Sequence, residues 1–161
     1  MHKTLVAYFS ASGTTRQIGQ TMAKIMEADV CEIKPKIAYT HADLNWHDPH
    51  SRSSVEMKDV HSRPEMADLE VDPSAYDTIY LGFPIWWYEA PRIISTFLES
   101  VDFKGKTIVI FATSGGSGMG ETLHQLKGCC PNANWIEGKV FHAFASKEEI
   151  GRWVEEIEKQ R

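Results

Sequence analysis

The sequence has few of the features that mark disulfide-rich or membrane proteins. It contains only three cysteines in 161 residues, Cys31, Cys129 and Cys130, and an odd number with two adjacent does not form a disulfide framework. No apolar run is long enough to cross a bilayer. The apolar run at 4–9 is too short for the hydrophobic region of a signal peptide. We therefore expect reduced, structural thiols, a cytoplasmic location and no membrane partner.

Positive charge is also scarce. The chain carries 17 basic and 22 acidic residues, a net charge of −5 with neutral histidine, and it has no basic tract. A nucleic-acid partner is therefore not expected. Hydrophobic residues make up 42% of the chain, which argues against disorder, and the length suits a single domain over residues 1–161 with its own core.

Short apolar runs alternate with helical patterns along the whole chain. The expected strands cover residues 4–9, 30–33, 78–83 and 107–112 and a segment near 135–136. A helix is expected at about 15–28, and apolar residues at helical spacing predict further helices along Ile93 to Val101, along Met119 to Leu126 and along Ile150 to Ile157, the last opened by a capping box from Ser146 to Glu149. This order predicts an α/β fold of βαβ units with a parallel sheet and right-handed crossovers.

One connection, residues 35–76, is too long for a simple helix between two strands. We expect it to contain a short helix and a long surface loop, and long loops inside small domains are often functional. It holds four histidines, His41, His47, His50 and His61. Their spacing fits no known zinc pattern, so we predict exposed or loop-packing histidines and no metal site.

The segment "SASGTT", Ser10 to Thr15, follows the first strand and leads directly into a helix. Ligands of open parallel sheets bind beyond the carboxyl ends of the strands. A helix N-terminus offers free backbone N–H groups and a positive dipole end, which together bind phosphate. The alternative is a hydroxyl-rich helix cap without a ligand.

Two further loops follow the third and fourth strands. The first contains three consecutive aromatic residues, Trp86, Trp87 and Tyr88, which suit stacking on a planar ligand or, alternatively, a packed hydrophobic corner. The second, Thr113 to Gly120, has four glycines and suits either backbone N–H donation to a ligand or a flexible loop. Together the three loops predict a site for a planar heterocycle with a terminal phosphate.

Two common nucleotide motifs do not fit. No Gly-x4-Gly-Lys segment is present, which excludes a P-loop NTPase, and the glycines at 116, 118 and 120 do not match the G-x-G-x-x-G fingerprint because Glu121 follows. These glycines also come after the fourth strand rather than the first, so a dinucleotide-binding Rossmann domain is not predicted.

The stretches "YFSASGTTRQIG", "GFPIWWYEAPR" and "FATSGGSGMG" together resemble the flavodoxin family over essentially the whole chain, in particular a bacterial flavodoxin-like group with a P-I-W-W loop. The resemblance implies a flavodoxin-like three-layer sandwich, a five-stranded parallel sheet in order 2-1-3-4-5, and bound FMN. It assigns Ser10, Ser12, Gly13, Thr14 and Thr15 to the phosphate, Pro84, Ile85, Trp86 and Trp87 to the isoalloxazine ring, and Thr113, Ser114, Gly115, Gly116, Ser117 and Gly118 to the pyrimidine edge.

The chain departs from the family pattern at two positions. Thr14 stands where many members have Asn, which keeps a short polar side chain. Glu89 stands where related sequences often have Gly, and a carboxylate at the flavin entrance would alter access or disfavour an anionic reduced flavin. Arg16 is the nearest cation to the predicted phosphate site, either as a ligand or as a solvent-facing side chain.

Three functions are compatible with these residues. The first is a low-potential electron carrier that docks transiently to redox partner proteins and has no catalytic residues of its own. The second is an FMN-dependent NAD(P)H or quinone reductase, which the aromatic loop and the 35–76 segment favour. The third, a binding domain without redox activity, is disfavoured because all three ligand loops are present.

Overall fold

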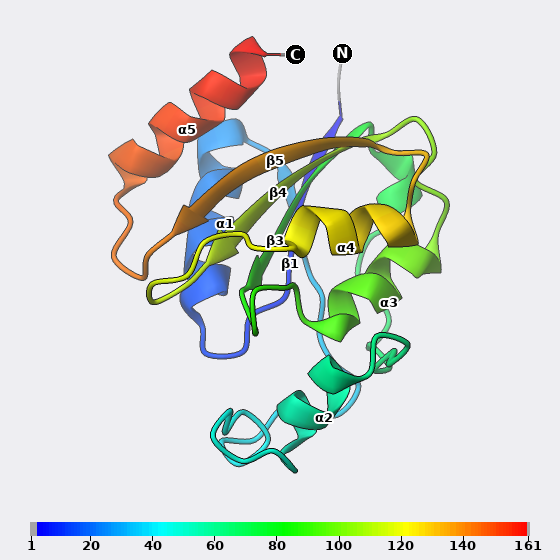
Figure 1. Ribbon diagram of the computed structural model, residues 1–161. Helices are drawn as coiled ribbons and strands as arrows, with labels where there is room; N and C mark the ends of the chain where they lie inside the picture. The colour runs from blue at the N-terminus through cyan, green and yellow to red at the C-terminus, as the bar shows by residue number, and fades with distance from the viewer. Residues whose placement is uncertain (1–2, 161) are drawn as a thin grey trace.

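A sheet of five parallel strands runs through the computed structural model, which describes residues 3–160. The strands are β1 (Thr4–Tyr8), β2 (Asp29–Glu32), β3 (Thr78–Pro84), β4 (Thr107–Thr113) and β5 (Asn134–Phe141). Their order in the sheet is β2-β1-β3-β4-β5, as Figure 1 shows. The predicted parallel α/β sheet and its strand order are therefore confirmed.

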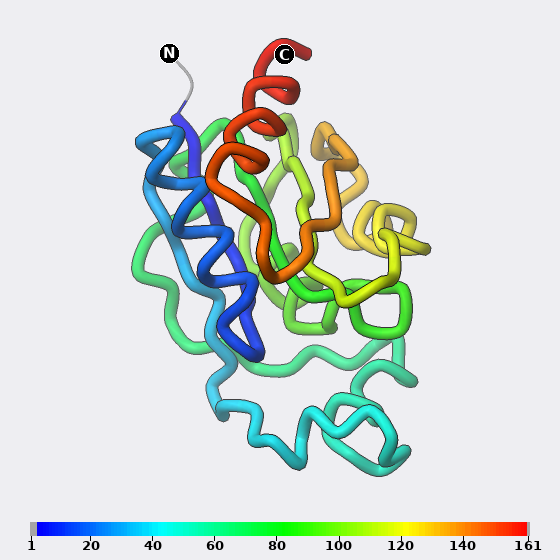
Figure 2. The backbone as a smooth tube through the Cα atoms, turned by 90° about the vertical axis from the view of Figure 1, so that its left-hand side faces the viewer, coloured from blue at the N-terminus to red at the C-terminus, as the bar shows by residue number. Residues whose placement is uncertain are grey.

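Two pairs of helices cover the two faces of the sheet (Figures 1 and 2). Helices α1 (Thr14–Met26) and α5 (Lys147–Lys159) pack together on one face, and α3 (Arg92–Ser100) and α4 (Thr122–Cys129) cover the other. Each pair closes its own hydrophobic cluster against the strands. The arrangement is the expected three-layer sandwich.

The central strands are buried on both faces, as their nearly continuous apolar runs predict. In β1, Leu5 and Ala7 belong to the cluster under α3 and α4, whereas Val6 and Tyr8 belong to the cluster under α1 and α5. This alternation follows from the two-residue period of a strand. It gives the short β1 a core contact with both helix pairs.

The register of the strands brings four loops to one edge of the sheet. Tyr8 of β1 is paired with Gly82 of β3, and Thr113 of β4 is paired with both Pro84 of β3 and Phe141 of β5. The segments that follow β1, β3, β4 and β5 therefore leave the sheet next to one another. One further backbone hydrogen bond joins two of these strand ends: Ile85 N donates to the Thr113 carbonyl oxygen at 3.0 Å.

The 35–76 connection contains helix α2 (Arg52–Lys58) and the short 3₁₀ turn η1 (Pro73–Ala75), so the predicted short helix and surface loop are confirmed. Helix α2 and its flanking loops lie at the bottom of Figures 1 and 2, below the loop after β3. The guanidinium of Arg52 lies 3.8 Å from the ring centre of Tyr39 and donates to the Ile37 carbonyl and the Glu56 carboxylate. The Tyr39 hydroxyl also donates to Glu56.

The starts of two helices can be compared with the sequence pattern. The predicted cap of α5 is confirmed, because Glu149 N donates to Ser146 Oγ at 3.1 Å. Helix α4 begins at Thr122, so Leu123 and Leu126 of the predicted helical pattern lie in it and Met119 precedes it. The cause is local: Gly120 has a φ of +56°, a left-handed conformation that a right-handed helix does not contain.

The remaining sequence predictions concern cysteines, histidines and membrane segments. The three cysteines are free, and burial raises the pKa of both Cys31 and Cys130. The four histidines of the 35–76 segment are exposed, and within residues 3–160 no group of three side chains could hold a metal ion. Across the same residues, no helix has the length and apolar character needed to cross a membrane.

Candidate cofactor site at the carboxyl edge of the sheet

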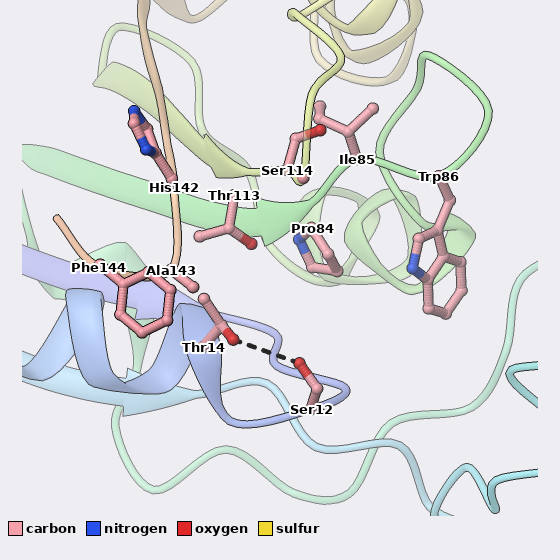
Figure 3. A pocket seen from close by; sticks show the side chains of 11 residues that line it. Ser12, Thr14, Pro84, Ile85, Trp86, Thr113, Ser114, His142, Ala143 and Phe144 are labelled. Atoms are coloured by element: carbon pink, nitrogen blue, oxygen red, sulfur yellow. Dashed lines mark hydrogen bonds between the residues drawn. The ribbon is translucent and has the colours of Figure 1, made fainter.

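Two adjoining cavities lie at the edge where the four loops leave the sheet. The first has a volume of about 420 Å³ and the second about 910 Å³, both within the usual range for small-molecule pockets. Figure 3 shows the first, with His142 and Phe144 at one end and Trp86 at the other. The two cavities share the residues Ser12, Pro84, Ile85, Trp86, Ser114 and Gly115.

Most of the predicted cofactor residues line these cavities. The first is lined by Ser12, Thr14, Pro84, Ile85, Trp86, Thr113, Ser114 and Gly115, whereas Trp87, Gly116 and Ser117 line only the second, and Ser10, Gly13, Thr15 and Gly118 line neither. The structure therefore brings the three predicted loops together around one space. Of the last four, Ser10 bonds to Gly13 and Thr15 bonds to Thr113, whereas Gly118 is exposed.

The N-terminus of α1 has backbone N–H groups available to bind an anion. Gly13, the residue before the helix, has a φ of +100°, and among the described residues no side chain caps this helix end. The Ser10 hydroxyl accepts a hydrogen bond from Gly13 N at 3.0 Å, which closes the preceding turn. The first-turn N–H groups of a helix have no partner within it, and beside them Ser12 and Thr14 line the first cavity.

Thr15 bonds to the sheet and lines neither of the two cavities. Its side chain is buried, and its hydroxyl lies 2.8 Å from the hydroxyl of Thr113 at the end of β4. This hydrogen bond fixes the start of α1 to the sheet. Thr15 therefore contributes to the phosphate-type site by positioning the helix end.

Arg16 is held by a carboxylate rather than directed at the cavity. Its Nη2 lies 2.8 Å from Oε2 of Glu32, and its Nε donates to Oε1 of the same side chain at 3.2 Å. The hydrogen bonds to Glu32 raise the pKa of Arg16. Among the residues described by the structure, no lysine or arginine lines either cavity. An anion bound there would meet hydroxyl groups and the helix end, with His142 at the wall of the first cavity.

The loop after β4 presents its backbone to the cavities. Ser114 Oγ accepts hydrogen bonds from Gly116 N at 3.2 Å and Ser117 N at 2.8 Å. The Ser114 and Ser117 hydroxyls also lie 2.7 Å apart. These bonds close a tight turn at the cavity wall. The wall consequently offers the hydroxyls of Ser114 and Ser117 to a polar ligand edge, whereas the N–H groups of Gly116 and Ser117 are bonded within the turn.

The loop after β3 contains a strained turn between Trp86 and Glu89. The two residues exchange backbone hydrogen bonds of 2.9 and 3.1 Å. Between them, Trp87 has a φ of +50° and Tyr88 a φ of +66°. Such values favour glycine or asparagine, and they cost about 1–3 kcal/mol for a bulky residue. The ring of Trp86 packs edge-on against Phe9 and Tyr39.

Contacts from α4 and α3 hold this turn. Glu121 N donates to the Tyr88 carbonyl at 3.0 Å. A Cβ on Gly120 would lie 2.6 Å from Tyr88 Cβ, so only glycine allows this approach. The Glu89 carboxylate pairs with the buried guanidinium of Arg92 at 2.8 Å. Strained residues of this kind persist only where their surroundings impose the conformation, and they cluster at functional sites.

Glu89 forms an ion pair and lines a third cavity, which it shares with Trp46 and Trp87. It lines neither of the two cavities and faces Arg92 of α3, which is 3% exposed. A second guanidinium nitrogen of Arg92 donates to the Met57 carbonyl oxygen at 2.7 Å. Glu89 and Arg92 therefore connect the strained turn to the end of α2.

Sequence reasoning missed two groups of lining residues. His142, Ala143 and Phe144 follow β5 and line the first cavity; the rule that strand ends carry ligand loops also applied to this strand and would have found them. Leu44, Trp46 and Ser53 come from the 35–76 segment and line the second cavity. Only the length of that segment indicated a functional role.

The strain in the turn predicts an unusual order of stability among Tyr88 variants. Tyr88→Gly should be more stable than Tyr88→Ala by about 0.5–1 kcal/mol, because a left-handed φ favours glycine by more than its chain entropy costs. Val55, an exposed residue inside α2, is the control, where Val55→Ala should be more stable than Val55→Gly. Urea unfolding of the four variants measures both differences. A Tyr88→Ala protein as stable as Tyr88→Gly would contradict the strain.

Comparison with known proteins places these features in a family. The flavodoxin family model matches residues 3–157. A candidate flavoprotein of Bacteroides uniformis ATCC 8492 is 49% identical, with 96% of this chain and 98% of that chain covered and a TM-score of 0.90. A second, from Bacteroides eggerthii DSM 20697, is 43% identical, with 98% and 99% covered and a TM-score of 0.90.

A more distant structure shares the fold. The flavoprotein of Lactobacillus acidophilus NCFM, solved in complex with FMN, is 23% identical, with 96% of this chain and 99% of that chain covered and a TM-score of 0.71. A search of curated proteins found no match. The family match over almost the whole chain, together with the sheet order and the loops at its carboxyl edge, shows that this chain belongs to the flavodoxin family.

Proposed function

We propose that the chain binds FMN at the carboxyl edge of the sheet and acts as a low-potential electron-transfer protein. FMN is the cofactor that family membership supports. The observation that carries the proposal is the uncapped N-terminus of α1 beside a cavity with planar, aromatic and peptide walls. FMN, when bound, supplies one- and two-electron transfer, and the protein supplies binding and electrostatics.

The donor set of this edge fits the parts of FMN. The first-turn N–H groups of α1 and the hydroxyls of Ser12 and Thr14 would hold the phosphate. Pro84, Ile85 and Trp86 offer a flat, largely apolar surface for the ring system. The turn from Ser114 to Ser117 offers its hydroxyl groups to the polar edge of the ring system.

The charge around the site supports a low potential. The nearest guanidinium on α1, that of Arg16, is neutralised by Glu32, and the whole chain has a net charge of −5. With little positive charge nearby, an anionic reduced flavin is disfavoured relative to the neutral oxidised ring. The protein therefore favours donation of electrons over their retention.

Exposed aromatic side chains at the same edge support transient docking of redox partner proteins. Phe144 is 95% exposed, and Trp87 and Tyr88 are also exposed. Aromatic residues are enriched at protein interfaces. A cytoplasmic location, favoured by the free cysteines, is part of the proposal.

Redox titration tests the proposed carrier. We expect the midpoint potential for full reduction of bound FMN to lie below that of free FMN. Glu32→Gln removes a negative charge beside the α1 N-terminus and frees Arg16, so this variant should have a higher potential. Glu65→Gln, at an exposed surface ion pair with Lys36, is the matched control and should leave the potential unchanged. A wild-type potential above that of free FMN would refute the low-potential carrier.

The alternative function is an FMN-dependent NAD(P)H or quinone oxidoreductase. The observation that favours it is the second cavity, because residues of the 35–76 segment wall it beside the predicted ring loop. A protein that only docks to other proteins does not need such a pocket.

Turnover without a partner protein separates the two functions. The carrier should oxidise no NADPH above the rate of free FMN when menadione is present and no other reductase is added. Free FMN at the same concentration is the control. Sustained NADPH oxidation by the FMN-loaded protein alone would replace the carrier with the oxidoreductase.

A further inference from the structure

The second cavity has a wall that the three cofactor loops do not provide. Leu44, Trp46 and Ser53 of the 35–76 segment line it together with Trp87 and Tyr88 of the strained turn. Ser12, Trp86 and Ser114 belong to the shared boundary with the first cavity. The cavity thus extends from the predicted cofactor loops to a separate part of the chain.

Ser53 carries a hydroxyl group that lacks a partner. The residue is 2% exposed, it lines the second cavity, and across residues 3–160 its Oγ has no hydrogen-bond partner. Neighbouring hydroxyls are satisfied: Ser54 Oγ donates to the Asp48 carbonyl at 2.7 Å and lies 2.9 Å from Ser51 Oγ. Buried polar groups are nearly always paired, so the Ser53 hydroxyl at this cavity wall is available to donate a hydrogen bond to a molecule that enters the cavity.

Two indole rings stand at the boundary of this cavity. Trp46 and Trp87 line both the second cavity and a third one of about 570 Å³ on the side of α2. They are 64% and 44% exposed, respectively, which is high for side chains of this size. Exposed, flat aromatic surface beside a cavity is suited to stacking on another planar molecule.

The lining of the second cavity carries no formal charge among the described residues. A dinucleotide with its negatively charged phosphates would find no cation there to compensate for lost hydration. A neutral planar compound would find indole surface and a hydroxyl donor. Of the two substrates of the alternative function, the lining favours the quinone.

We propose that the wall formed by Trp46, Ser53 and Trp87 binds a neutral, planar aromatic carbonyl compound of the quinone class. The Ser53 hydroxyl donates to a carbonyl oxygen of this compound, and the indole rings contact its plane. The inference rests on the proposed binding of FMN, and it assigns the second cavity to the quinone-reducing form of the alternative function. Electrons in turn reach the flavin from a separate donor protein.

The wall is held in place before any ligand arrives. Ser53 N donates to the Asp43 carbonyl at 3.0 Å, and Arg52 beside it contacts Tyr39 and Glu56. At the other end of α2, the Met57 carbonyl accepts from Arg92. These bonds fix α2 relative to the turn at Trp87, and preorganisation of this kind lowers the entropy cost of binding.

Calorimetric titration of the oxidised, FMN-loaded protein with menadione, a neutral naphthoquinone, tests the inference. Wild type should bind menadione, and Ser53→Ala should raise its Kd about fivefold to tenfold. Trp46→Ala should raise the Kd about tenfold, and Trp46→Phe should restore much of the binding because it keeps an aromatic face. Ser62→Ala, in the same segment and outside the cavities, should leave the Kd unchanged.

Stability and FMN affinity distinguish this role from others. Because its hydroxyl is unpaired, Ser53→Ala should keep or raise the Tm, whereas Ser54→Ala should lower it. The Kd for FMN should change less than twofold in Ser53→Ala. A clear loss of Tm in Ser53→Ala, an equal loss of FMN affinity, or an unchanged menadione Kd in both Ser53→Ala and Trp46→Ala would each overturn the inference.

Failure of the inference can be distinguished from failure of the proposed function. A wild-type protein that retains FMN and binds no menadione refutes the quinone site alone. A wild-type protein that does not retain FMN refutes the proposed function, and the acceptor site is refuted with it.

Discussion

The candidate site depends on one buried guanidinium group, that of Arg92. It pairs with Glu89 at 2.8 Å and donates to the Met57 carbonyl oxygen at 2.7 Å, so it joins α3, the strained turn and α2. A buried charge is costly unless it is paired, and removal of Arg92 would leave both partners unsatisfied. Through these contacts Arg92 fixes the two segments that carry Trp87 and Trp46. The geometry of the second cavity follows from this connection.

The rest of the site follows from the parallel sheet. Because the strand ends are in register, the four loops meet at one edge. The Thr15–Thr113 hydrogen bond then holds the start of α1 against the end of β4. This helix end and the neighbouring hydroxyls of Ser12 and Thr14 make a site suited to an anion. Arg16 lines neither cavity, and its guanidinium pairs with Glu32.

Much of this architecture could be predicted from sequence because it depends on local patterns. Apolar runs located the strands, helical spacing located α1, α3 and α5, and the rule for strand ends located the three loops. Contacts between distant residues were not predictable. Thr15 meets Thr113, Glu89 turns toward Arg92, and Ser53 reaches the cavity only through the path of the 35–76 segment. No local periodicity encodes these pairings.

Retention of FMN compared with riboflavin tests the central claim most directly. The account predicts that the apoprotein, incubated with FMN and passed through gel filtration, keeps the flavin absorption bands. Riboflavin, which has the same ring system without the phosphate, should be largely lost, because the α1 N-terminus with Ser12 and Thr14 provides much of the binding free energy. Loss of FMN on the column, or equal retention of both flavins, would contradict the account.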